Sequence, residues 1–93
     1  NGWHRAFRGA VERFLTAHAA GDEAALVEFV PDRALRQRLP PALRAEPVCD
    51  ARETPGGEAV SVAAVDGAGR PWTLVFRRAG TRWRLTAARP VLQ

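Results

Sequence analysis

Large side chains recur at intervals of three and four over residues 3–20, and this spacing predicts one long amphipathic helix. The inward stripe of this helix consists of Trp3, Phe7, Val11, Phe14, Leu15 and His18. Gly21 is expected to close the helix, because glycine adopts the left-handed backbone conformation at low steric cost. Asp22 is then placed to cap a second helix, so Gly21 and Asp22 together predict a corner between two helices.

Two shorter helical segments are expected to follow this corner. The first covers residues 23–30, which carry four large apolar side chains. Pro31 is placed to begin the next segment, whose apolar side carries Leu35 and Leu39. Because two consecutive prolines come next, the helical half of the chain should end there without a convincing strand.

The hydrophobic pattern changes to a period of two after Pro47, with β-branched residues in the alternating positions and Gly or Pro between the runs. This pattern predicts an antiparallel meander of about four strands. The expected strands cover residues 46–52, 58–65, 71–78 and 82–89.

The last hairpin is expected to turn at Ala79 and Gly80. That turn would pair Phe76 with Trp83, Leu74 with Leu85 and Trp72 with Ala87 on an apolar face, and Arg77 with Arg82 and Val75 with Arg84 on a wet face. A slip of one residue would bury the arginines, so this assignment of faces is favoured.

The preceding hairpin allows two registers. A three-residue loop over 67–69 would set Asp66 opposite Arg70 and align Val60, Val62 and Ala64 with Phe76, Leu74 and Trp72. A four-residue loop would instead turn Ala59, Ser61 and Ala63 inward. The first register is favoured because it gives the larger apolar core.

These elements predict the α+β class, with two to three N-terminal helices packed on a curved antiparallel sheet of about four strands. The 93 residues suffice for one two-layer core, and we expect a single domain with a helical half over 2–40 and a sheet half over 46–90. No apolar run approaches the length of a membrane-spanning helix. The single cysteine, Cys49, excludes an internal disulfide and a cysteine-based zinc site, and it is expected to be a small buried residue.

The charged residues limit the functional classes further. A net charge of +4 with ten carboxylates spread along the chain permits nucleic-acid binding but does not indicate it. All fourteen basic residues are arginine, which together with the many alanines suggests a GC-rich bacterial source. The chain begins Asn1-Gly2 and lacks methionine, so we expect a processed or truncated piece, from which a signal or anchor could have been removed upstream.

Both halves of the chain match the pattern of a known superfamily. The helices carry Phe-x6-Phe-Leu-x5-Gly-Asp, and the sheet ends in Gly-x-x-Trp-x-Leu. The matching residues are Phe7, Phe14, Leu15, Gly21, Asp22, Gly80, Trp83 and Leu85. The chain therefore resembles the nuclear-transport-factor-like superfamily, also called the ketosteroid-isomerase-like or polyketide-cyclase-like fold. This resemblance implies a cone in which the curved sheet folds over the long helix, with a pocket between them.

The superfamily includes isomerases, cyclases and dehydratases, and also members without catalysis that serve as assembly or binding domains. The isomerases use a carboxylate base with a tyrosine or protonated acid as oxyanion donor, and this chain has no tyrosine. The chain is short for the superfamily, which implies a shallow or filled pocket. Its size is similar to extracytoplasmic domains of membrane-anchored bacterial proteins, such as conjugation-channel subunits and small lipoproteins.

The resemblance places any ligand pocket between the long helix and the sheet. Its expected lining is Trp3, Phe7, Phe14, His18, Trp72, Phe76 and Trp83. Within it, His18 and an inward Asp50 are the only candidates for an acid–base pair. We favour the structural interpretation, in which His18 bonds to free carbonyl groups at the end of its helix and Asp50 is solvated.

The densest basic patch of the sequence lies around the last hairpin. It consists of Arg77, Arg82 and Arg84, with Arg78 at the turn. Such a patch could bind phosphate, anionic lipid or an acidic partner surface, or it could be a solvated face that discourages aggregation. The resemblance implies a dimer contact on this outer sheet face. The predicted register puts the aromatic residues on the other face, which disfavours nucleic acid.

We therefore predict a non-enzymatic binding or assembly module of a bacterial secreted or membrane-anchored protein, located outside the cytoplasm. Its partner would be another protein or a second copy, bound through the outer sheet face, and membrane contact would come only from a segment outside this chain. No cofactor and no metal are implied. The alternatives are a small-molecule or isomerase-like domain that uses the cone, and a binder of anionic surfaces that uses the arginines.

Overall fold

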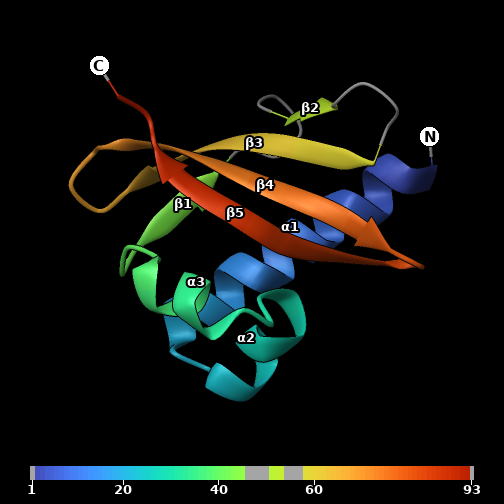
Figure 1. Ribbon diagram of the computed structural model, residues 1–93, viewed down its shortest axis with the longest axis horizontal. Helices are drawn as coiled ribbons and strands as arrows, with labels where there is room; N and C mark the ends of the chain where they lie inside the picture. Colours follow the sequence, from blue (N-terminus) through green and yellow to red (C-terminus); the bar gives the residue numbers. More distant parts are fainter. Residues whose placement is uncertain (1, 46–50, 54–57, 93) are drawn as a thin grey trace.

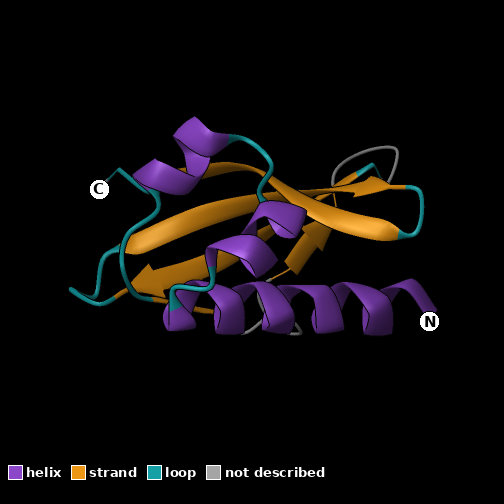
Figure 2. Cartoon of the chain, turned by 90° about the horizontal axis from the view of Figure 1, so that it is seen from below, coloured by secondary structure: helices purple, strands orange, loops and turns teal. Residues whose placement is uncertain are grey.

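The computed structural model describes residues 2–45, 51–53 and 58–92 and shows three N-terminal helices packed with an open antiparallel sheet, which confirms the predicted α+β class (Figure 1). The helices are α1 (Gly2–Ala20), α2 (Glu23–Phe29) and α3 (Arg33–Arg38). The strands are β1 (Leu43–Ala45), β2 (Ala51–Glu53), β3 (Ala59–Asp66), β4 (Pro71–Ala79) and β5 (Arg82–Pro90). Helix α1 runs along one face of the sheet, whereas α2 and α3 lie beside β5 (Figures 1 and 2).

Helix α1 buries one stripe, as its periodicity predicts. The buried side chains, three or four positions apart, belong to Phe7, Ala10, Val11, Phe14 and Ala17. Gly21 ends the helix with a φ of +67°, a conformation that L side chains rarely adopt. The predicted corner between α1 and α2 is therefore confirmed.

Aspartates begin both short helices. The Asp22 carboxylate accepts a hydrogen bond from the backbone N–H of Ala25 at 3.1 Å, and thereby caps α2 as predicted. Asp32 does the same for α3, accepting from the N–H groups of Ala34 and Leu35. These caps matter because helices of seven and six residues gain little stability from their own hydrogen bonds.

The sheet has the strand order β1-β3-β4-β5, and β2 also pairs with β3. Strand β1 was not predicted, because a strand of three residues is too short to show an alternating pattern. The predicted first strand, 46–52, falls partly outside the described residues, and its described end lies in β2. All strand pairs are antiparallel, so the predicted meander of β3, β4 and β5 is confirmed.

The hairpin of β3 and β4 has the predicted three-residue loop. Val60, Val62 and Ala64 lie opposite Phe76, Leu74 and Trp72. The Asp66 N–H donates to the Arg70 carbonyl at 2.9 Å, which closes the loop as expected. The three inward residues of β3 are buried, which agrees with the choice of the register that gives the larger core.

The predicted pairing of β4 with β5 was wrong by two residues. The turn uses Gly80 and Thr81, so Ala79 pairs with Arg82, Arg78 with Trp83, Arg77 with Arg84 and Phe76 with Leu85. Gly80 has a φ of +65° and stands at the first central position, where a type II′ hairpin turn requires glycine. A shift of two residues leaves each side chain near the turn on its predicted face.

A β-bulge changes the pairing in the second half of β5. Val75 pairs with Ala87 and Leu74 with Ala88, so Thr86 is an extra residue without a partner position. Its hydroxyl donates to the Val75 carbonyl at 3.3 Å. The predicted pair of Trp72 with Ala87 is therefore replaced by Trp72 with Pro90. A single-residue insertion of this kind leaves no signature in the alternating pattern.

Candidate binding surfaces

Aromatic rings fill the space between α1 and the sheet where a ligand pocket was predicted. The ring centroid of Phe7 lies 5.7 Å from that of Phe76 and 5.0 Å from that of Trp83, and Phe14 lies 5.8 Å from Phe76. All three contacts are edge-to-face, which is a favourable geometry for aromatic pairs. These four predicted pocket residues are buried and form part of one hydrophobic cluster that joins the helices to the sheet.

Of the other two tryptophans that were expected to line the pocket, Trp72 is the one whose side chain is described. Trp72 is half-buried on β4, and its indole N–H donates to the Asp66 carboxylate at 2.9 Å. Trp3 belongs to the first turn of α1, and its side chain lies outside the described part of the chain. Trp72 therefore stabilises the β3–β4 turn and packs, half-buried, against the hydrophobic cluster that contains Phe76.

His18 connects the end of α1 to the segment after α3. Its Nε2 lies 2.6 Å from the Pro40 carbonyl, and because a carbonyl only accepts, this nitrogen is the donor. The imidazole stacks on Phe14, with ring centroids 6.0 Å apart and planes 9° apart. The histidine bonds to a carbonyl, as its structural interpretation requires, but the carbonyl belongs to a distant segment instead of the end of its own helix.

The acid–base pair that was considered for His18 involves Asp50, which lies outside the described residues, as does Cys49. Across the ranges 2–45, 51–53 and 58–92, no hydrogen bond or ion pair joins His18 to a carboxylate. Among the described residues, the contacts of His18 with Pro40 and Phe14 are therefore structural, and its pairing with Asp50 stays an untested prediction.

Asp66 is the one carboxylate among the described residues that is buried. One of its oxygens accepts from the backbone N–H groups of Ala68 and Arg70, both at 2.9 Å, and the other accepts from Trp72. The hydrogen bond from Trp72, followed by that from the Arg70 N–H, lowers the pKa of Asp66 below its ordinary value of 3.8. This carboxylate thus organises a turn and stays ionised at neutral pH.

The sheet face turned away from α1 carries a set of arginines, which we call the arginine face. Its exposed guanidinium groups belong to Arg44, Arg52, Arg77, Arg84 and Arg89. The alternation of the strands assigns all five to this side, opposite the buried residues. Between them the face carries small and β-branched side chains, namely Ser61, Ala63, Val65, Thr73, Val75 and Ala87.

The arginine face lacks counterions among the described residues. The ion pairs in the described part of the chain, Arg8 with Glu12 and Arg36 with Glu23, lie on the helices and not on this face. Arg77 and Arg84 lie directly opposite each other on neighbouring strands, an arrangement that destabilises a sheet. Glu53 lies on the inner face of the sheet, since it pairs with Val60, whose side chain points inward. The face is therefore uniformly positive over its described part.

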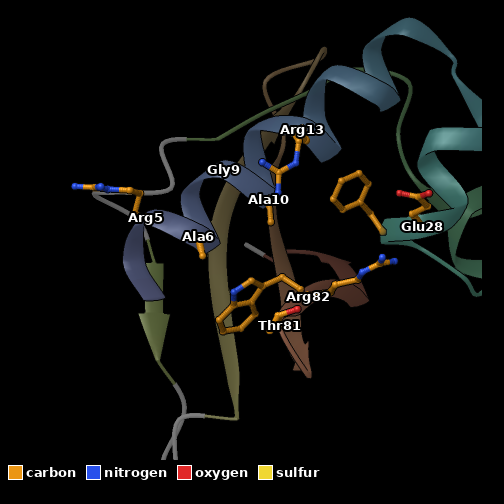
Figure 3. Close-up of a pocket in the computed structure, with 10 residues that line it drawn as sticks. Arg5, Ala6, Gly9, Ala10, Arg13, Glu28, Thr81 and Arg82 are labelled. Atoms are coloured by element: carbon orange, nitrogen blue, oxygen red, sulfur yellow. The ribbon is translucent and has the colours of Figure 1, made fainter. Parts of the chain in front are cut away.

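The predicted basic patch divides between two places. Arg77 and Arg84 are neighbours on the arginine face. Arg82 is the first residue of β5 and lines a hollow between α1, α2 and the β4–β5 turn (Figure 3). Arg78 lies over the Trp83 ring, with its guanidinium carbon 5.0 Å from the ring centroid, as in a cation–π contact.

The hollow near Arg82 was not predicted, because it arises from the packing of α2 against α1. The sequence signal that could have indicated it is Gly9, a glycine in the interior of a helix.

None of the helices in the described part of the chain is long and apolar enough to cross a membrane. Nor does that part contain a group of three or more His, Cys, Asp or Glu side chains that could hold a metal ion. Comparisons of the chain with protein-family models, with curated proteins and with solved structures found no match.

Proposed function

We propose that this chain is a non-enzymatic binding and assembly module of a bacterial secreted or membrane-anchored protein, and that its arginine face contacts an acidic surface of a protein partner. The observation that carries the proposal is the cross-strand pair of Arg77 with Arg84, flanked by further arginines and without a carboxylate among the described residues of that face. A partner's carboxylates would supply the missing counterions.

The composition of the arginine face favours a protein partner over nucleic acid. Its centre consists of small and β-branched side chains, and its charges lie around them, so the face shares with protein–protein interfaces an uncharged centre surrounded by a charged rim. Single-stranded nucleic acid is bound by aromatic residues that stack on bases. Here the described aromatic side chains of the sheet, Trp72, Phe76 and Trp83, belong to the opposite face.

A second copy of the chain is a poor partner for the same surface. An isologous dimer would bring the two arginine faces together, so that like charges would face each other across the interface. The proposal is therefore a heteromeric contact. The conjugation-channel subunits and lipoprotein domains that the sequence resembles are the proposed setting, supported by the all-arginine composition and the size of the chain.

The alternative function, an isomerase-like or cyclase-like active site inside the cone, has less support. Phe7, Phe14, Phe76 and Trp83 occupy the space in which the substrate would lie. The Nε2 of His18 is bound to the Pro40 carbonyl.

The test is a double charge reversal, Arg77→Glu with Arg84→Glu. It replaces one like-charged cross-strand pair by another, so the stability of the sheet should change little while the sign of the surface is inverted. Binding to candidate partner domains is measured by calorimetry and by light scattering at several salt concentrations. We expect the reversal to abolish a salt-sensitive complex with one copy of each chain.

The matched control is Arg33→Glu with Arg38→Glu on α3, which changes the net charge equally at exposed positions away from the sheet. A complex that the α3 control disrupts and the sheet variant leaves intact would refute the proposed surface. A chain that self-associates through the arginine face would refute the heteromeric contact.

A further inference from the structure

A hollow opens next to the aromatic core where α1, α2 and the β4–β5 turn meet (Figure 3). Its volume is about 340 Å³, within the range of small-molecule sites in proteins. Phe29 and Trp83 contribute apolar lining, and α1 contributes Ala6 and Ala10. A second hollow shares Phe29 with it and continues along α1 toward Ala20, so the two form one groove beside α2.

Charged side chains surround the opening of this hollow. Arg13 comes from α1, Arg82 from β5 and Glu28 from α2. Figure 3 shows Arg82 and Glu28 extending toward each other, whereas Arg5 points away from the hollow. None of these residues belongs to an ion pair within the described chain. Arg13 and Arg82 therefore line the hollow together with a single carboxylate, which leaves an excess of positive charge.

Gly9 leaves room for the side chain of Arg13 beside helix α1. A Cβ atom added at Gly9 would be 3.1 Å from the Nη1 atom of Arg13, which is closer than nine in ten real Cβ contacts, so the Arg13 side chain would have to shift by a few tenths of an ångström. The guanidinium of Arg13 thus folds back over the bare backbone of Gly9, at the side of the hollow. Glycine is the least favourable residue inside a helix after proline, and the position of Arg13 is what this glycine makes possible.

We propose that the hollow is a binding site for a small molecule that carries one anionic oxygen group, a carboxylate or a phosphate, on an apolar body. Arg13 and Arg82 bind the anionic group from two sides, as guanidinium groups bind planar oxyanions. Phe29 and the alanines of α1 contact the apolar body. Glu28 repels a second negative charge, so a carboxylate is preferred to a phosphate dianion. This site is separate from the arginine face and does not depend on its function.

The experiment titrates the ¹⁵N-labelled chain with phenylacetate, with phenyl phosphate and, as the uncharged control, with phenylacetamide. We expect saturable shifts of the amide signals of Gly9, Glu28 and Thr81 and of the Trp83 indole signal. Phenylacetate should bind most tightly and phenylacetamide at least about tenfold more weakly, the difference expected for the loss of one charge-assisted interaction. Arg82→Gln should weaken phenylacetate binding by a similar factor.

Gly9→Ala is the most informative variant, because it should change thermal stability and phenylacetate binding in opposite directions. Alanine should raise the midpoint of thermal unfolding, since it favours the helix, and yet weaken phenylacetate binding, since it displaces Arg13. Arg33→Gln on α3 is the matched control for the loss of one charge and should bind normally.

Three results would overturn the inference: equal binding of phenylacetamide, normal binding by both Gly9→Ala and Arg82→Gln, or no saturable shift with either anion. The sheet variant Arg77→Glu with Arg84→Glu should leave phenylacetate binding intact, so failure of this site and failure of the proposed partner surface are distinguishable. Shifts that map to Arg77 and Arg84 would also count against the hollow.

Discussion

At the scale of single residues, Asp66 has the clearest energetic role, because the chain surrounds its carboxylate with donors. The backbone N–H groups of Ala68 and Arg70 and the indole N–H of Trp72 all donate to it. These donors satisfy a carboxylate that the fold buries, and unsatisfied buried polar groups are costly. The same bonds lower its pKa, so its protonation should be linked to unfolding.

We expect Asp66→Asn to remove part of the acid sensitivity of the protein. The pKa of Asp66 is lower in the folded chain, so its contribution is fully present above the ordinary value of 3.8 and is lost as pH falls through the folded value. The measurement is the free energy of unfolding in urea at neutral pH and at a pH below 3.8. The variant should be less stable than the parent at neutral pH, and the difference between their free energies of unfolding should become smaller in acid. A difference that is unchanged in acid would contradict the linkage.

His18 illustrates which residue roles the sequence could predict. Its place in the last turn of α1 followed from spacing, and a bond to a carbonyl was expected on that basis. The identity of the acceptor, Pro40, depends on how α3 returns the chain to α1, which local sequence does not specify. The stripe that includes Phe7 and Phe14 was predicted correctly because it depends only on helical periodicity.

At the scale of elements, the two hairpins of the sheet differ in how far sequence determined them. The β3–β4 loop could be predicted because Asp66 and Arg70 frame three small residues, and only one register fills the core. The β4–β5 turn could not, because Gly80 can occupy either central position of a two-residue turn. Strand β1 is too short for its pattern to be recognised, and the hollow of Figure 3 requires two helices to pack first.

Gly80→Ala should destabilise the chain by about 1 to 2 kcal/mol, because alanine resists the left-handed conformation that this turn needs. Gly80→Asn should recover only a small part of the loss, since asparagine tolerates a positive φ better than other residues with a side chain, but mostly in the αL region rather than at the first central position of a type II′ turn. The check is urea unfolding of the three proteins under one condition. No atom lies within 4 Å of a Cβ placed at Gly80, so a steric clash would not account for the effect. Equal stability of all three would show that the turn can relax.

At the scale of the whole molecule, the charge distribution is asymmetric. The inner side of the sheet packs on α1 through aromatic and aliphatic residues, while the outer side carries the arginine face. Like charges that lack counterions reduce the stability of a fold, and they do so most at low salt. A surface used for binding can retain such a cost, because the bound partner removes it.

We therefore expect Arg84→Thr to stabilise the free chain by about 0.2 to 1 kcal/mol at low salt, since it removes the like-charged neighbour of Arg77 and suits a strand. The gain should shrink as sodium chloride is added. Urea unfolding at low and high salt measures both effects. Arg38→Thr is the control, because Arg38 lies in the last turn of α3, where a positive charge is favourable. A stabilising effect of Arg38→Thr equal to that of Arg84→Thr would attribute the gain to net charge alone.

The extra residue in β5 has a consequence for changes in chain length. Because Thr86 has no partner position on β4, a chain from which Thr86 is deleted keeps Leu85 and Ala88 on the inner face and Arg89 on the arginine face. Deletion of Trp83, which lies outside the bulge, would instead move Arg84 and Leu85 to the opposite faces of the sheet. The bulge thus marks a place in this strand at which related sequences could differ in length by a residue and still present the same surface.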